Sequence, residues 1–116
     1  MNLNGQKVAI LGAGRSGRAA ARLALRHGGE VTLYDAADSG AFEGVGEGLE
    51  CHPRATVKTG RSLAADLVVT SPGIETDGEF ARSFADGAGE FIGETEFAAR
   101  YYGGIVVGIT GTNGKT

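Results

Sequence analysis

The sequence is poor in cysteine, in basic charge and in long apolar runs, and each shortage excludes a class of protein. The single cysteine, Cys51, excludes a disulfide within the chain, which fits a reducing compartment. A net charge of −3 provides no basic field of the kind that binds nucleic acid. No apolar run reaches the ~18 residues of a membrane-spanning helix. Because the N-terminal stretch MNLNGQKVAIL also lacks a secretory signal, we expect a cytoplasmic protein with no nucleic-acid or membrane partner.

Glycine, by contrast, is abundant and accounts for 21 of the 116 residues. So many glycines indicate tight turns and places where two backbone segments approach each other closely. The length suits one domain rather than two, and a chain of this size can bury roughly 65% of the surface that its unfolded form exposes. We therefore expect one domain with a hydrophobic core.

Short apolar strands alternate with helical segments along the chain. Lys7 to Leu11 predicts a buried strand, Arg15 to His27 a helix that ends at two glycines, and Glu30 to Tyr34 a second strand. Strand, helix and strand in this order form a right-handed βαβ unit. Residues 36–53 have a weak pattern and predict a loop that contains a short helix. Beyond this loop we predict strands at 55–59, 67–70, 90–92 and 105–109. We also predict a helix at 77–88, capped by Asp77, and another at 94–102. The alternation predicts an α/β fold that is Rossmann-like, with an open, mostly parallel sheet and flanking helices.

A glycine-rich loop follows the first strand. Gly12, Gly14 and Gly17 spell G-x-G-x-x-G where the predicted helix begins. In such a loop the first glycine permits a sharp turn, the second lets a diphosphate approach the backbone, and the third lets helix and strand pack closely. The free N–H groups of the first helical turn favour an anion there. The loop therefore predicts a nucleotide-type ligand.

Charged residues near this loop leave two interpretations open. Arg15 and Arg18 lie in the first helical turn, where a cation is unfavourable unless a phosphate binds nearby. Alternatively, they continue a solvated helix face with Arg22 and Arg26. Asp35 ends the second strand and could accept ribose hydroxyls, or it could simply cap the turn. Taken alone, these residues favour an NAD(P)-binding domain of an oxidoreductase or a ligand sensor.

A second glycine loop ends the sequence, in 105-IVVGITGTNGKT-116. Lys115 would supply positive charge to the β- and γ-phosphates of ATP, Thr116 a hydroxyl for Mg²⁺, and the backbone amides a cradle. The general P-loop pattern requires glycine where this chain has Ile109. The spelling is therefore a narrower variant of the phosphate-binding loop.

GITGTNGKT resembles the ATP-binding loop of the Mur ligases, ATP-dependent enzymes that add amino acids to the peptidoglycan precursor. The segments VAILGAGRSG, LYDA, ADLVVTSPGI and FIGETEFAAR, in that order, are similar to the N-terminal domain of the D-glutamate-adding members. The resemblance covers nearly the whole chain. It implies that residues 1–93 form a Rossmann-like UDP-binding domain, and that residues 94–116 contain a linker helix and the first strand and truncated ATP-binding loop of a central domain.

The resemblance also implies site residues. For the substrate UDP-N-acetylmuramoyl-L-alanine it assigns the diphosphate to Gly14, Arg15, Ser16 and Gly17, the uracil edge to Asp35 and Ala36, and the uridine side to Ser71, Pro72 and Gly73. Ala37 stands where the family often has an arginine that covers the uracil, which leaves stacking by that residue open. For ATP in the intact enzyme it assigns Gly111, Thr112, Asn113, Gly114, Lys115 and Thr116, with Thr116 as the Mg²⁺ ligand.

The implied reaction is amide formation through an acyl-phosphate: ATP phosphorylates the substrate carboxylate, and the amine of D-glutamate displaces phosphate. We expect no catalytic residue in this stretch, no activity and no bound cofactor for the chain alone, and at most weak binding of a UDP-linked ligand. The strand at 105–109 could pair with another sheet edge and give a strand-exchanged dimer. The alternatives are the NAD(P)-binding domain, which leaves TGTNGKT unexplained, and a folded chain that binds no ligand.

Overall fold

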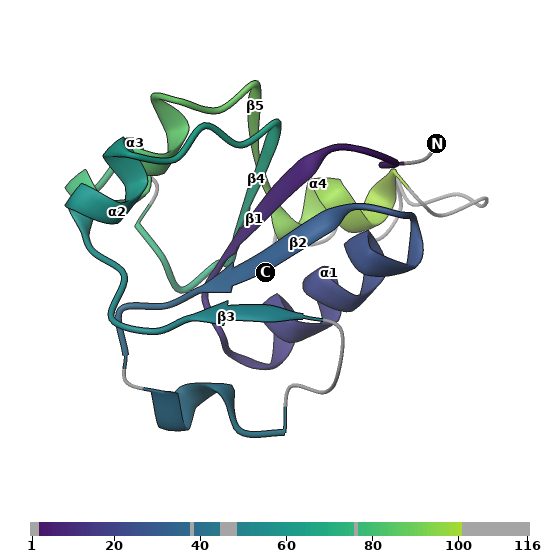
Figure 1. Ribbon diagram of the computed structural model, residues 1–116, viewed down its shortest axis with the longest axis horizontal. Coiled ribbons are helices and arrows are strands. Elements are labelled where there is room, and N and C mark those ends of the chain that lie inside the picture. Colours follow the sequence, from purple (N-terminus) through teal and green to yellow (C-terminus); the bar gives the residue numbers. More distant parts are fainter. Residues whose placement is uncertain (1–2, 38, 45–48, 76, 101–116) are drawn as a thin grey trace, which may run out of the picture.

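The computed structural model describes residues 3–37, 39–44, 49–75 and 77–100, and these form an open α/β sheet (Figure 1). Five parallel strands pair in the order β3-β2-β1-β4-β5. The strands are β1 (Lys7–Leu11), β2 (Glu30–Tyr34), β3 (Glu50–His52), β4 (Leu67–Thr70) and β5 (Glu90–Gly93). The helices are α1 (Arg15–Arg26), α2 (Val57–Arg61), α3 (Glu79–Ala85), α4 (Glu94–Ala99) and the short 3₁₀ helix η1 (Ser39–Phe42). The predicted Rossmann-like fold is confirmed.

Helices cover both faces of the sheet, with α1 and α4 on one face and α2 and α3 on the other (Figure 1). Successive residues of β1 point to opposite faces, so Ile10 belongs to the same core as Phe97 of α4, and Leu11 to the same core as Phe84 of α3. A fully buried side chain of this size stabilises the fold by about 1.5–3 kcal/mol. The central strands β1 and β4 are therefore almost wholly apolar in sequence.

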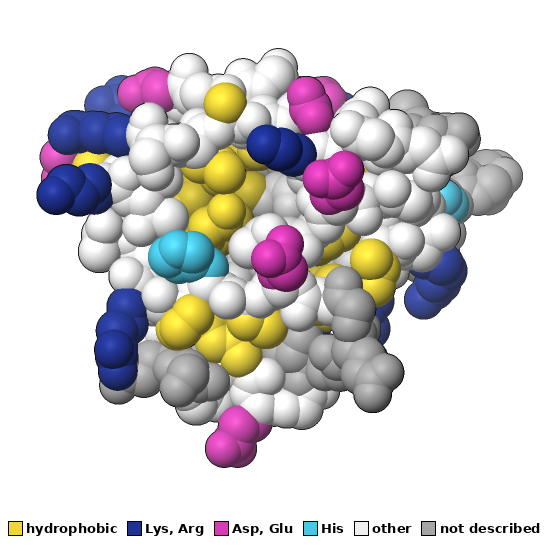
Figure 2. Space-filling model, viewed as in Figure 1, with side chains coloured by type: hydrophobic (Ala, Val, Ile, Leu, Met, Phe, Trp, Pro, Cys, Tyr) yellow, Lys and Arg dark blue, Asp and Glu magenta, His cyan; other side chains and the backbone are white. Residues whose placement is uncertain are grey.

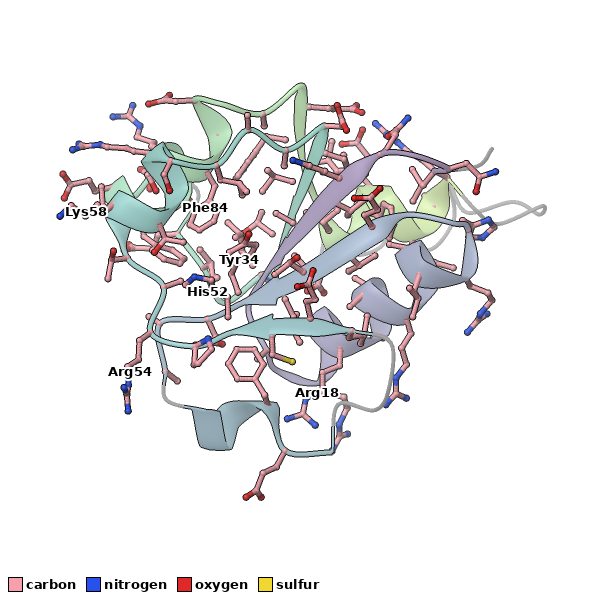
Figure 3. All side chains as sticks on the ribbon, viewed as in Figure 1. Arg18, Tyr34, His52, Arg54, Lys58 and Phe84 are labelled. Atoms are coloured by element: carbon pink, nitrogen blue, oxygen red, sulfur yellow. The ribbon has the colours of Figure 1, made fainter. Side chains whose placement is uncertain are left out.

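Aromatic rings fill the core beneath α3. The ring of Tyr34 lies between those of His52 and Phe84, at centroid distances of 5.2 and 5.1 Å (Figure 3). Burial raises the pKa of the Tyr34 hydroxyl above its ordinary value. Figure 2 shows hydrophobic side chains still visible between α2 and the strands, where partly buried residues pack against this core.

The direction in which strands are added reverses at β1. From β1 the chain adds β2 and β3 on one side, and it then returns to add β4 and β5 on the other. The loops that follow β1 and β4 therefore leave the sheet beside each other and turn to opposite sides. Ligands of open α/β folds bind in the crevice at such a point, outside the carboxyl ends of the strands.

The strand predicted at 55–59 is wrong. The third strand lies earlier, at β3, and residues 57–61 form α2 instead. The side chain of Thr56 accepts a hydrogen bond from the Thr59 N–H, and the Thr59 hydroxyl accepts one from the Thr56 N–H at 3.0 Å. This reciprocal capping box satisfies two N–H groups that would otherwise be unpaired, and it makes the segment start a helix.

The helix predicted at 77–88 is shorter, and the Asp77 cap is wrong. The chain is still extended at Gly78, and α3 begins only at Glu79, so Asp77 lies one residue too early for its carboxylate to cap the helix. The helix predicted at 94–102 is confirmed as α4, which ends at Ala99. The strand predicted at 105–109, and the strand-exchanged dimer that depends on it, lie outside the described residues and stay predictions.

An ion-pair network joins the end of α4 to the start of β5. The guanidinium of Arg100 donates to both carboxylate oxygens of Glu90, with Nη1 to Oε1 at 3.0 Å, and to Glu96 Oε2 at 3.1 Å. These hydrogen bonds lower the pKa of the Glu90 carboxyl. The network links the C-terminal end of α4 to the start of β5.

Candidate functional site

The glycine loop makes a sharp turn between β1 and α1. Gly12 has a φ of 104°, which side chains other than glycine rarely adopt. A Cβ on Gly17 would lie 1.8 Å from the carbonyl oxygen of Gly12, so α1 can approach β1 this closely only with glycine there. Apart from Gly14 and its two neighbours in the chain, no described residue has an atom within 4 Å of the place that a Cβ on Gly14 would take. The geometry therefore fits the predicted turn at Gly12 and close packing at Gly17, and it leaves open space at Gly14.

The N-terminus of α1 offers unpaired backbone donors. The helix is 12 residues long, its N-cap Gly14 has no side chain to cap it, and its first turn holds no acidic residue. The first intrahelical hydrogen bond runs from the Arg18 N–H to the Gly14 oxygen at 2.9 Å. The amides of Arg15, Ser16 and Gly17 precede it and have no partner within the helix. Together with the helix dipole, these amides favour an anion.

The carboxylate of Asp35 holds the glycine loop in place. Its Oδ2 accepts a hydrogen bond from the Ala13 N–H at 2.7 Å, and its Oδ1 accepts one from the Ala37 N–H at 2.8 Å. The two bonds support the capping interpretation of Asp35, since both oxygens are used by the backbone. Ala36 lies between them and is exposed. A contact of Asp35 or Ala36 with the ligand stays a prediction.

The segment of Ser71, Pro72 and Gly73 lies beside the glycine loop. The Ser71 N–H donates to the Leu11 oxygen at 3.1 Å, and a Cβ on Gly12 would lie 2.3 Å from Ser71 Oγ. Pro72 and Gly73 are exposed. The structure therefore brings together the three loops that the sequence singled out, after β1, β2 and β4, at the carboxyl edge of the sheet.

Two cavities of opposite charge lie at the carboxyl edge of the sheet. The basic cavity, of about 440 Å³, is lined by Ala13, Gly14, Arg15, Arg18, Ala19 and Arg22. Figure 3 shows Arg18 on the side of α1 that faces η1, and its Nε donates to the Ala13 oxygen at 2.9 Å. The acidic cavity, also of about 440 Å³, lies beyond β4 and β5 and is lined by Thr70, Ser71, Pro72, Ile74, Glu75, Asp77, Gly93, Glu94 and Thr95. The charges of the lining residues favour an anion in the first cavity over the second.

The sequence analysis missed two polar groups, the buried Thr70 and the half-buried Glu94, each of which has one enclosed oxygen. Glu94 Oε2 and Thr70 Oγ1 are enclosed without a hydrogen-bond partner among the described residues. Burial raises the pKa of the Glu94 carboxyl, and a hydrogen bond with the Ser16 side chain opposes that shift. An acid directly after the edge strand β5 was the available signal for Glu94, because the carboxyl ends of all parallel strands meet at one edge.

The predicted ATP-binding residues lie outside the described part of the chain. They are Gly111, Thr112, Asn113, Gly114, Lys115 and Thr116, the last of which is also the predicted Mg²⁺ ligand. Within the described residues, no group of three or more His, Cys, Asp or Glu side chains is placed to hold a metal ion. In the same part of the chain, no helix is long and apolar enough to cross a membrane.

Comparison with known proteins gives no matching family model but many similar curated proteins. The chain is 35% identical over 121 residues to the UDP-N-acetylmuramoylalanine--D-glutamate ligase of Lachnoclostridium phytofermentans, which covers 100% of this chain and 27% of the relative. It is 40% identical over 117 residues to the ligase of that name from Microcystis aeruginosa, covering 95% of this chain and 26% of the relative. For the corresponding ligase of Anaeromyxobacter dehalogenans the identity is 39% over 121 residues, covering 98% of this chain and 26% of the relative.

The fold and the loops at its carboxyl edge thus define a Rossmann-like domain with a glycine loop at the start of its first helix. The chain belongs to the family of the UDP-N-acetylmuramoylalanine--D-glutamate ligases. It spans about a quarter of the length of the curated relatives that it matches. The predicted resemblance to the D-glutamate-adding Mur ligases is confirmed.

Proposed function

We propose that this chain is the UDP-substrate-binding part of an ATP-dependent ligase that adds D-glutamate to UDP-N-acetylmuramoyl-L-alanine. The observation that carries the proposal is the unpaired first turn of α1 beside the basic cavity, in a chain similar over its whole length to ligases of that name. The diphosphate of a uridine-diphosphate sugar is an anion with several oxygens, and it matches a set of convergent amides. Such a ligase acts in the synthesis of the peptidoglycan precursor in the cytoplasm, and through the cell wall it supports cell shape and division.

The amides of Arg15, Ser16 and Gly17 bind the diphosphate in this proposal. Gly14 permits the close approach, because its Cα faces open space. Arg15 lines the basic cavity and adds positive charge at the same end of the helix. A phosphate bound here also removes the unfavourable interaction of Arg15 with the helix dipole.

The uridine lies across the loops that follow β2 and β4. Ser71, Pro72 and Gly73 form one wall, since they are next to the glycine loop and partly or fully exposed. Asp35 and Ala36 form the other wall, and Ala37 adds no side chain that could stack on the base. We therefore infer that the affinity for the uracil depends on the backbone edges of these loops.

In the intact enzyme the loop TGTNGKT is proposed to bind ATP, with Lys115 on the phosphates and Thr116 on Mg²⁺. ATP supplies the phosphoryl group that activates the substrate carboxylate, and D-glutamate then supplies the amine. The residues described here contribute substrate binding and orientation. We expect the 116-residue chain alone to be catalytically inactive.

Isothermal titration of the chain with UDP-N-acetylmuramoyl-L-alanine and, separately, with NADH tests the proposal. We expect measurable binding of the UDP compound and none of NADH. Binding of NADH alone would instead support the dinucleotide-binding alternative. If neither compound binds to a chain that circular dichroism shows to be folded, the proposed binding role is wrong.

A further inference from the structure

Thr70 ends β4 with a buried hydroxyl that has no partner. The residue is only 3% exposed, and its Oγ1 has no hydrogen-bond partner among the described residues. The side chains of the neighbouring strands cannot supply one, because Thr70 pairs with Leu11 of β1 and with Gly93 of β5. A buried polar group without a protein partner is uncommon and indicates a bound water, ion or ligand. The fold therefore leaves one hydroxyl at the end of β4 to be satisfied from outside the chain.

Open space adjoins this hydroxyl. Thr70 and Gly93 both line the acidic cavity of about 440 Å³. Residues paired in register across a parallel sheet point to the same face, so a side chain on Gly93 would lie beside that of Thr70. Apart from Gly93 and its two neighbours in the chain, no described residue has an atom within 4 Å of the place that a Cβ on Gly93 would take. A ligand in the acidic cavity can therefore approach Thr70 from the side of Gly93.

The other groups that line the acidic cavity favour a cation. They include the carboxylates of Glu75, Asp77 and Glu94, and no lysine, arginine or histidine is among the described residues that line it. Glu94 Oε2 is enclosed and, like Thr70 Oγ1, has no hydrogen-bond partner in the described part of the chain. An ionised carboxylate only accepts hydrogen bonds, and a hydroxyl can accept them too. A fitting ligand therefore carries positive charge and hydrogen atoms to donate.

An organic ammonium fits these groups better than a metal ion does. Within the described residues, no three His, Cys, Asp or Glu side chains are placed to hold a metal ion together. The acids stand on two segments, since Glu94 begins α4 whereas Glu75 and Asp77 belong to the loop between β4 and α3. Pro72 and Ile74 give the cavity an apolar part. A short alkyl chain with an ammonium group at each end offers charge to both segments and apolar contact between them.

We propose that the acidic cavity is a second binding site, for a small alkyl diamine, whose ammonium groups donate to Thr70 Oγ1 and Glu94 Oε2 at the sheet and pair with Glu75 and Asp77 at the loop. The site is separate from the basic cavity at the start of α1, to which the proposed function assigns the diphosphate. It adjoins Ser71, which the proposed function places beside the uridine. Because no group of the UDP compound takes part in it, the inference does not depend on the proposed function.

An NMR titration of the ¹⁵N-labelled 116-residue chain with 1,4-diaminobutane tests the proposal. Both amines of this probe are charged at neutral pH. We expect saturable shifts of the backbone N–H groups of Thr70, Ser71, Gly93 and Glu94. The uncharged 1,4-butanediol has the same chain length and should shift none of them at the same concentrations. Shifts that do not saturate, or that centre on acids outside the cavity, would overturn the proposal, and so would an equal response to the diol.

Thr70→Val separates a built site from a general attraction to acids. The change nearly keeps the shape of the side chain and removes an unpaired buried hydroxyl, so we expect the variant to be at least as stable as the unaltered chain. It should bind the diamine about tenfold more weakly, as the loss of one hydrogen bond implies. Thr32→Val makes the same change on β2, outside the cavity, and should leave the affinity unchanged. Undiminished binding by Thr70→Val would contradict the proposal.

The charges of the cavity have their own matched pair of variants. Asp77→Asn should weaken diamine binding several-fold, because it removes a charge that lines the cavity. Asp86→Asn removes the same charge from an exposed residue outside the cavity and should change the affinity little. Equal losses for the two variants would mean that no defined site exists. Since Asp77 is exposed on a loop, this pair decides the question even if Thr70→Val fails to fold.

UDP-N-acetylglucosamine, whose diphosphate probes the start of α1, keeps the two proposals apart. A folded chain that binds this UDP sugar and not the diamine would overturn the present inference and leave the proposed function standing. A folded chain that binds the diamine at the four amides above and not the UDP sugar would do the reverse. Failure to bind either compound would overturn both proposals.

Discussion

Gly12 and Gly17 meet across the start of α1, where a Cβ on Gly17 would lie 1.8 Å from the carbonyl oxygen of Gly12. The contact places the first turn of the helix directly over the end of β1. As a result, the unpaired amides of α1 lie at the crevice between the loops that follow β1 and β4. The position of the candidate anion site therefore depends on Gly17 having no side chain.

Replacing Gly17 should therefore destabilise the fold. We expect Gly17→Ala to lower the free energy of unfolding by about 1–3 kcal/mol, because the helix must move away from β1. Urea denaturation followed by circular dichroism measures the loss. Gly14→Ala is the matched control, and it should cost at most about 1 kcal/mol, since its Cβ meets open space at an N-cap. Equal stability of the two variants would contradict the close packing.

Removing the carboxylate of Asp35 should also destabilise the chain, through the loop that it holds. Asp35→Ala leaves two backbone N–H groups unpaired, and Ala13, which carries one of them, is only 3% exposed. We expect a loss of about 1–3 kcal/mol in the same denaturation experiment. Asp35→Asn retains one acceptor oxygen, so its stability should lie between those of the Asp35→Ala variant and the unaltered chain. An Asp35→Ala variant as stable as the unaltered chain would show that these bonds do not hold the loop.

Arginines of α1 should differ in their effect on ligand binding. Arg15 lines the basic cavity at the start of the helix, whereas Arg26 is an exposed residue of its last turn. We expect Arg15→Ala to weaken the binding of UDP-N-acetylglucosamine several-fold. The affinity of the variant should depend no more steeply on salt than that of the unaltered chain. Arg26→Ala, which removes the same charge far from the cavity, should change the affinity little. Equal losses for both would point to a diffuse charge effect instead of a site.

The link between Arg100 and Glu90 predicts a pH-dependent stability. The pKa of Glu90 is lowered in the folded chain, so its contribution is complete above the unfolded pKa and is lost as the pH falls through the folded pKa. Glu90→Gln should therefore lower the melting temperature slightly near neutral pH and leave it unchanged in acid. The difference should shrink with added salt, because Glu90 is exposed. Glu43→Gln, another exposed change, should show no such pattern.

The sequence was sufficient to predict β1, β2 and β4 but not β3. Strands buried on both faces appear as continuous apolar runs, as in the LVVT of β4. The edge strand β3, Glu50–His52, is exposed along its length and has no such run. Helix α2 is set partly by packing, because a Cβ on Gly60 would lie 2.0 Å from Ser83 Oγ of α3. A contact between residues so far apart in the sequence leaves no local pattern to read.

The candidate site likewise has parts that the sequence predicted and parts that only the structure shows. The glycine loop was predictable because its turn and its packing involve residues within one short stretch. The position of Glu94 directly after β5 could be read from the sequence, but the environment of its carboxylate could not, because it depends on α4 lying beside α1. Asp35 was recognised as a site residue, but its two bonds to the loop backbone appear only in the structure.

The most direct test of the account is an amide map of ligand binding. A ¹⁵N-labelled chain is titrated with UDP-N-acetylglucosamine, and in parallel with NADH, and the chemical shifts of the backbone N–H groups are followed. We predict that the UDP sugar shifts the amides of Arg15, Ser16 and Gly17 most strongly, and that NADH leaves them unchanged. Shifts centred elsewhere, or an NADH response at these three amides, would contradict the assignment of the α1 N-terminus to the diphosphate of a uridine sugar.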